Sequence, residues 1–233
     1  MASSAQALQV SPMELETRAF VTRVYGWMSA GLALTGAIAY AVAGNEELAR
    51  AIVLNRVIFW GLLLAELGLV WILSAAIGKM SMAVASGMFL TYAALNGLTL
   101  SVIFLVYTSG SIALTFFVTG GTFAAMCAYG ATTKRDLTSM GNLMFMALIG
   151  LILASAANWF FQNEALYWVT TYAGVIIFVG LTAYDAQKIK RMSQVLEEGS
   201  EAERKGAITG ALALYLDFIN LFLYLLRIFG RRK

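Results

Sequence analysis

Three acidic side chains stand where a membrane protein tolerates charge least. Of the thirteen aspartates and glutamates, Glu66, Asp185 and Asp217 fall inside long apolar segments, whereas the others lie in tails and connections. A charged side chain at the centre of a membrane helix costs about 2.5–3.5 kcal/mol on insertion scales. We therefore expect each of these carboxyls to be protonated, paired, or facing a wet cavity.

Asp185 and Asp217 offer the most specific chemistry of the three. Asp185 lies near the end of one apolar segment and Asp217 lies within the next, so both can occupy the same half of a bilayer, although the sequence leaves open whether they meet. Two adjacent carboxyls in a low dielectric cannot both ionise cheaply, so they share a proton and titrate as a pair. One protonation state would join two helices through a hydrogen bond, and the other would repel or attract a cation. We interpret the two aspartates as a candidate pH sensor and ion gate.

Helical spacing places the aspartates on polar stripes. Small and polar residues recur every three or four positions through Asp217 and Asn220, and a similar stripe ends at Asp185. A third stripe contains Asn96. Glu66 has apolar neighbours on its own face, so a simple hydrogen bond to a neighbouring helix is an equal alternative there. Glu66, Asn96 and Asn220 are the candidate ion-pathway residues, and Asp185 could instead be an interfacial residue.

The segments that carry these residues predict the fold. The chain has 233 residues, of which 60% are hydrophobic and 12% charged, whereas soluble domains are about a quarter charged. Helices of about 20 apolar residues cross a hydrocarbon layer. We predict an all-α polytopic membrane protein with a polar N-terminal tail (1–21), a seven-helix transmembrane domain (22–229) and a basic C-terminal tail (230–233). The expected apolar segments are 22–43, 57–76, 83–107, 111–131, 140–161, 166–187 and 207–229.

Composition and charge exclude several classes of function. The chain has no histidine and one cysteine, so imidazole metal sites and internal disulfides are excluded. No phosphate-binding loop or soluble domain is present for primary pumping. We expect no cofactor, and no nucleic-acid partner, because the net charge of +3 reflects basic loops.

The distribution of Lys and Arg predicts the orientation. These residues are concentrated in the connections on the N-terminal side, which predicts a cytoplasmic N-terminus. With seven spans the basic C-terminal tail lies on the opposite side, which the same rule disfavours, so a re-entrant segment is the alternative. The chain has no Asn-x-Ser/Thr site, its single cysteine allows no internal disulfide, and we expect no targeting extension. We expect the bacterial inner membrane, with the endoplasmic reticulum as the alternative.

Two stretches resemble a known family. "TAYDAQKIK" followed by "ALALYLDFINLFLYLLRIFG" is similar to the signature of the Bax inhibitor-1 family, the transmembrane Bax inhibitor motif proteins. The resemblance implies a seven-helix bundle with a central C-terminal helix and a pH-sensitive calcium leak. Its sensor pair would be Asp185 and Asp217, which would bind calcium weakly and transiently. Glu66 is similar to an acid in the second helix of relatives. Some relatives carry an arginine latch near the end of that helix; this chain has Ser-Ala-Ala there, and Lys79 is the nearest candidate latch.

Several functions remain open at this point. The leading prediction is a proton-gated calcium leak with calcium ions, protons and the lipid bilayer as its partners. One alternative is a regulator that binds other membrane proteins, such as a membrane protease or components of a stress or cell-death pathway. Another is a calcium/proton exchanger using the same carboxyls. An intramembrane protease would also need paired aspartates, but the Gly-x-Gly-Asp signature is missing, so we predict that the protein is not an enzyme.

Overall fold

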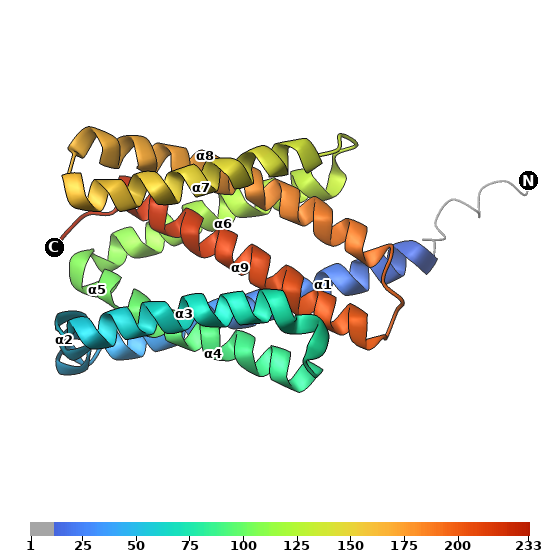
Figure 1. The fold of residues 1–233 in the computed structure, drawn as a ribbon, viewed down its shortest axis with the longest axis horizontal. Helices are drawn as coiled ribbons and strands as arrows, with labels where there is room; N and C mark the ends of the chain where they lie inside the picture. Colours follow the sequence, from blue (N-terminus) through green and yellow to red (C-terminus); the bar gives the residue numbers. More distant parts are fainter. Residues whose placement is uncertain (1–11) are drawn as a thin grey trace, which may run out of the picture.

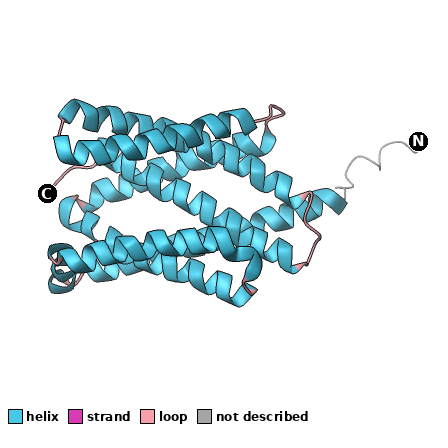
Figure 2. Cartoon of the chain, in the orientation of Figure 1, coloured by secondary structure: helices cyan, strands magenta, loops and turns pink. Residues whose placement is uncertain are grey.

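The computed structural model describes residues 12–233, which are almost entirely helical (Figure 2). This confirms the all-α prediction. The helices in chain order are α1 (Pro12–Ala43), α2 (Glu46–Leu54), α3 (Arg56–Ala76), the short 3-10 helix η1 (Ile77–Lys79), α4 (Met82–Leu100), α5 (Val102–Val106), α6 (Ser109–Thr132), α7 (Thr138–Phe161), α8 (Glu164–Ser193) and α9 (Glu201–Phe229).

Seven helical stretches of the described chain are long and apolar enough to cross a membrane, in agreement with the seven predicted segments. Several of these helices are longer than their apolar parts. α1 begins at Pro12, ahead of the expected start at residue 22, and α8 continues to Ser193. Polar residues extend a helix readily where its end leaves the apolar layer, and for this reason hydropathy alone underestimates helix length.

Two details differ from the expected segments. The connection after α1 contains α2, a short helix that places Ala49 and Ile52 against the bundle. The third apolar segment is divided into α4 and α5 at Ser101, whose hydroxyl donates to the Leu98 carbonyl oxygen. Bonds of this kind compete with the helix ladder and often bend helices, so a polar side chain marks the break in this proline-free segment.

α9 is the central helix of the bundle, and it is the most buried of the seven spans. It packs against α1, α4, α6 and α8, and it crosses diagonally between the other helices in Figure 1. Tyr215 is a fully buried side chain of α9 and packs edge-to-face on Phe89 and Tyr92 of α4. The predicted central C-terminal helix is therefore confirmed.

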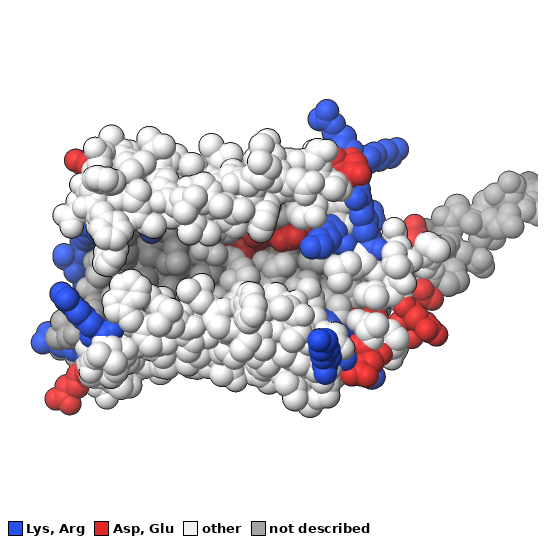
Figure 3. Space-filling view, in the orientation of Figure 1, with Lys and Arg blue, Asp and Glu red and all other residues white. Residues whose placement is uncertain are grey.

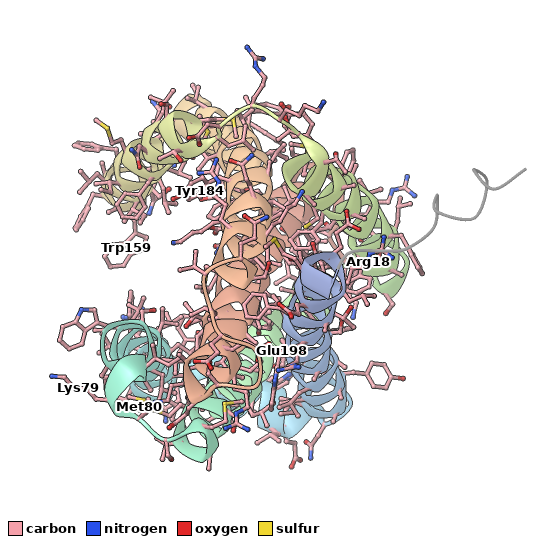
Figure 4. The ribbon with its side chains drawn as sticks, turned by 90° about the vertical axis from the view of Figure 1, so that its right-hand side faces the viewer. Arg18, Lys79, Met80, Trp159, Tyr184 and Glu198 are labelled. Carbon is pink, nitrogen blue, oxygen red and sulfur yellow. The ribbon has the colours of Figure 1, made fainter. Side chains whose placement is uncertain are left out.

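The helices around α9 form two walls. One wall contains α1, α3 and α4, and the other contains α6, α7 and α8 (Figure 1). α3 packs chiefly on α4, and α7 packs chiefly on α8. Viewed along the bundle in Figure 4, the ring of helices is open on the side between α3 and α7, and the labelled Trp159 borders this opening. The opening exposes one face of α9.

The described chain ends at the opposite end of the bundle from the start of α1 (Figure 1). The short tail after α9 pairs with the α5–α6 connection, since Tyr107 and Arg232 form an antiparallel bridge and Lys233 donates its backbone N–H to the Val106 carbonyl oxygen. An odd number of spans accounts for the separated ends. A cytoplasmic N-terminus stays a prediction.

Candidate functional site: an aspartate pair in a lateral cleft

The structure brings Asp185 and Asp217 together. α8 and α9 pack along each other, and the two carboxyl groups line the same cleft and interact with each other. Asp217 is buried, with 4% of its surface exposed, and Asp185 is half-buried. No hydrogen-bond donor in the described chain reaches Oδ2 of Asp217. A proton shared between the two acids is therefore the natural way to satisfy that oxygen.

Small residues bring the helices close enough for this contact. Gly210 of α9 lies against Ile189 of α8, and an added Cβ there would approach its side chain to 3.0 Å. On the other flank of α8, Gly130 of α6 faces the Ala183 carbonyl oxygen and the Ala186 methyl group. Close backbone approach at small residues is the usual mode of helix packing in membranes, and it positions Asp185 from both sides.

The aspartates line a cleft of about 690 Å³ between α3, α7, α8 and α9. The polar stripe of α9 forms its floor. Figure 3 shows acidic side chains at the bottom of the hollow between the two walls, with basic side chains beside them. The residues that α9 contributes to the cleft are Ala213, Leu216, Asp217, Asn220 and Tyr224.

The cation beside the pair is Lys188, one turn beyond Asp185 on the same helix. It lines the same cleft, its charge acts on Asp185, and its ammonium lies 5.9 Å from the centre of the Tyr184 ring. Lys79, the candidate latch, is exposed in η1 and points away from the bundle in Figure 4. The sequence did contain a signal for Lys188. It follows Asp185 by three residues, and that spacing places two side chains on the same face of a helix.

Glu66 sits on the opposite wall in a different environment. Its Oε1 accepts a hydrogen bond of 2.6 Å from the Thr99 hydroxyl, and its Oε2 accepts one of 3.4 Å from the Asn96 amide. Both donors belong to α4, and all three side chains are buried. The Asn96 amide also donates to the Tyr92 hydroxyl over 3.2 Å. A hydrogen bond between Glu66 and a neighbouring helix is one of the alternatives that the sequence left open, and the structure contains such hydrogen bonds.

Asn220 lies where two clefts meet. It lines the aspartate cleft and also a second cleft of about 730 Å³ that contains Glu66 and Asn96. Its amide donates to the Leu216 carbonyl oxygen of its own helix over 2.8 Å. The candidate pathway residues therefore border two adjoining hollows along one face of α9. Across residues 12–233 no group of three or more acids or cysteines is close enough to hold a metal ion. A cation in the aspartate cleft would therefore find two carboxylates, those of Asp185 and Asp217.

Sequence reasoning missed one buried acid. Glu203, in the first turn of α9, is 4% exposed and accepts hydrogen bonds of 3.1 Å at both carboxylate oxygens from Arg23 of α1. Oε2 also accepts from the Gly199 backbone N–H at 2.8 Å. The Ser-x-x-Glu spacing from Ser200 to Glu203 is a capping signal, and the Ser200 hydroxyl caps the helix at 3.0 Å. The partner arginine, 180 residues away, carried no such signal.

Comparison with known proteins places this bundle among its relatives. Residues 17–233 match the family described as "Inhibitor of apoptosis-promoting Bax1". The chain belongs to the Bax inhibitor-1 family. It is 54% identical to "Inner membrane protein YbhL" of Escherichia coli (strain K12), with 92% of each chain covered. It is 46% identical to a protein of Borreliella burgdorferi, again with 92% of each chain covered.

Membership of the Bax inhibitor-1 family agrees with the resemblance found in the two quoted stretches. The name of the Escherichia coli relative and the seven apolar helices together support a multi-pass inner membrane protein. Each stretch contains one of the paired aspartates: the first lies near the end of α8 and the second forms most of α9. The family signature is therefore the sequence of the floor and one side of the cleft.

Proposed function

We propose that this Bax inhibitor-1 family protein is a pH-sensitive calcium leak gated by Asp185 and Asp217. The observation that carries the proposal is the contact between these two carboxyls on adjacent helices at the edge of a cleft. With one proton between them the acids hold α8 to α9. When that proton leaves, two negative charges repel and attract a cation.

Calcium is the cation that suits this chemistry. It prefers six to eight oxygen ligands, and two carboxylates with a nearby amide supply a partial, hydrated site rather than a closed cage. Conduction needs such weak binding, because an ion must leave as readily as it enters. We assign the pair ion handling rather than hydrolysis, with Asn220, Asn96 and Glu66 along the route.

The test is calcium flux into proteoliposomes containing the purified protein, measured across a range of pH. We expect flux to rise with pH as the pair loses its shared proton, and we expect Asp217→Asn or Asp185→Asn to flatten that response. Glu198→Gln is the matched control, because Glu198 is an exposed acid of the α8–α9 connection (Figure 4). An unchanged pH response in both aspartate variants would defeat the proposal.

The same preparation separates the alternatives. Flux that requires an opposing proton gradient identifies a calcium/proton exchanger built on the same carboxyls. Absence of flux at every pH, from folded protein without partners, favours a regulator that binds other membrane proteins.

A further inference from the structure

A second feature of the molecule lies at the end of the bundle where α7 and α9 end and α8 begins. A cavity of about 660 Å³ opens there, and both Arg227 and Arg232 line it. Glu164 is the acid in the lining, so two positive charges face one negative charge. The other polar side chains in the lining are Asn158, Gln162 and Asn163. This end cavity thus combines polar and aromatic side chains and carries a net positive charge.

Arg227 is held in position by aromatic rings. Its guanidinium carbon lies 4.9 Å from the centre of the Tyr224 ring and 5.5 Å from that of Tyr167. A guanidinium that contacts a ring face keeps the N–H groups of its edge available for an acceptor. Among the ion pairs of the described chain none involves Arg227. The arginine is therefore an oriented donor whose anion is not supplied by the described residues.

Arg227 also borders the second cleft, so the end cavity continues into an apolar slot. This slot lies between α3, α4, α5 and α9. Its outer part is lined by aliphatic and aromatic side chains, and its deeper polar groups include Glu66 of α3 together with side chains of α4 and α9. Trp60 of α3 and Trp159 of α7 meet across the opening with ring centres 6.0 Å apart. The apolar lining on α3 consists of Phe59, Trp60, Leu63, Leu64, Leu67 and Val70.

We propose that the end cavity and this slot together bind one anionic phospholipid. Its phosphate would lie on Arg227 and Arg232, and an acyl chain would lie along the outer apolar lining that α3 contributes to the slot, clear of the deeper polar groups that border the proposed ion route. The charge of the cavity favours a phosphate over a neutral head group, since a guanidinium binds phosphate through paired hydrogen bonds. The depth fits as well, because Arg227 is in the last turn of α9 and tryptophans at span ends favour the head-group level. The slot opens sideways, where lipid chains are the surrounding solvent.

The experiment is native mass spectrometry of the detergent-purified full chain with added dioleoyl phosphatidylglycerol or dioleoyl phosphatidylcholine. The two lipids share their chains and differ in net charge. We expect one tightly retained phosphatidylglycerol per chain, and about fivefold weaker retention in Arg227→Gln, since one basic group near a lipid surface contributes about that factor. Arg231→Gln is the matched control, because Arg231 carries the same charge in the tail just after α9 but lines neither cavity.

Further arms keep the test decisive. Arg232 lies outside the helices, so Arg232→Gln should leave the fold intact. It should also weaken retention of phosphatidylglycerol, which tests the proposal even if the Arg227 variant misfolds. An excess of glycerol phosphate should leave the lipid bound; complete displacement would show a free-anion site and overturn the lipid assignment. Equal retention of the two lipids, equal loss in the Arg231 control, or a dimer that buries the slot without lipid would overturn it too.

Discussion

Glu66 and Asp217 are both buried carboxyls of the same bundle, and they are satisfied in opposite ways. Glu66 receives hydrogen bonds from a hydroxyl and an amide of α4, which serve it whether it is ionised or not. Asp217 faces another acid, so its contact depends on a proton. A carboxyl surrounded by donors fixes two helices together, whereas a carboxyl opposite a carboxyl can release them. The difference between structural acid and switch lies in the partner rather than in burial.

The largest expected effect comes from combining substitutions at the two sites. If Asp185 and Asp217 act as one unit, the double variant Asp185→Asn, Asp217→Asn should show the same flat pH response of calcium flux as either single variant. A flux that follows one titrating proton changes about tenfold per pH unit within its range, and all three variants should lose that dependence. Glu66→Gln should keep it. If the double variant lost clearly more of the pH response of calcium flux than either single variant, the two aspartates would act as separate acids rather than as a pair.

The next effect disturbs the pair without touching a charge. In Gly130→Ala the new methyl group on α6 would overlap the Ala183 carbonyl oxygen of α8, so α8 must shift near Asp185. Overpacking of this kind typically costs about 1–3 kcal/mol. We expect a lower melting temperature and an altered pH response of flux. Gly121→Ala on the same helix is the control, since a Cβ there meets nothing within 4 Å; an equal loss in both variants would contradict the packing argument.

The donor side of the Glu66 site predicts a smaller, purely structural effect. Thr99→Val removes the 2.6 Å hydrogen bond to Glu66 while preserving shape. Leaving a buried acceptor without its donor costs about 1–3 kcal/mol, partly offset here because Asn96 remains. Thermal unfolding in detergent should show the loss, with the pH response of flux retained. If Thr99→Val had normal stability but its calcium flux no longer responded to pH, Glu66 would belong to the pH switch rather than having a structural role.

The smallest effect concerns an exposed acid that, like Glu66, is surrounded by donors. Thr138 and the Arg191 guanidinium lower the pKa of Asp136 from 3.8 to about 2. Because the folded-state pKa is the lower one, the contribution of Asp136 to stability is present above about pH 4 and is lost as the pH falls toward 2. Asp136→Asn should therefore lower the melting temperature slightly at pH 7 and not at pH 2. The variant's melting curve across that range measures it, and a difference that persists at pH 2 would contradict the assignment.

The sequence by itself determined the membrane-spanning segments of this protein and the polar and acidic residues within them. Apolar length and helical period are local properties, so seven spans, the acids within them and the polar stripes of α8 and α9 were readable directly. The short α2 was not predicted, because nine residues of amphipathic helix do not register as a span.

Tertiary structure alone decided which of these residues meet. In the folded chain Asp185 lies beside Asp217, and Glu66 accepts a hydrogen bond from a side chain of α4. Arg23 pairs with Glu203, and Lys188 rather than Lys79 lies beside the aspartates. The tertiary structure also leaves the bundle open between α3 and α7. These outcomes depend on how helices cross and how closely small residues let them approach, and both are set by many weak contacts spread over distant parts of the chain.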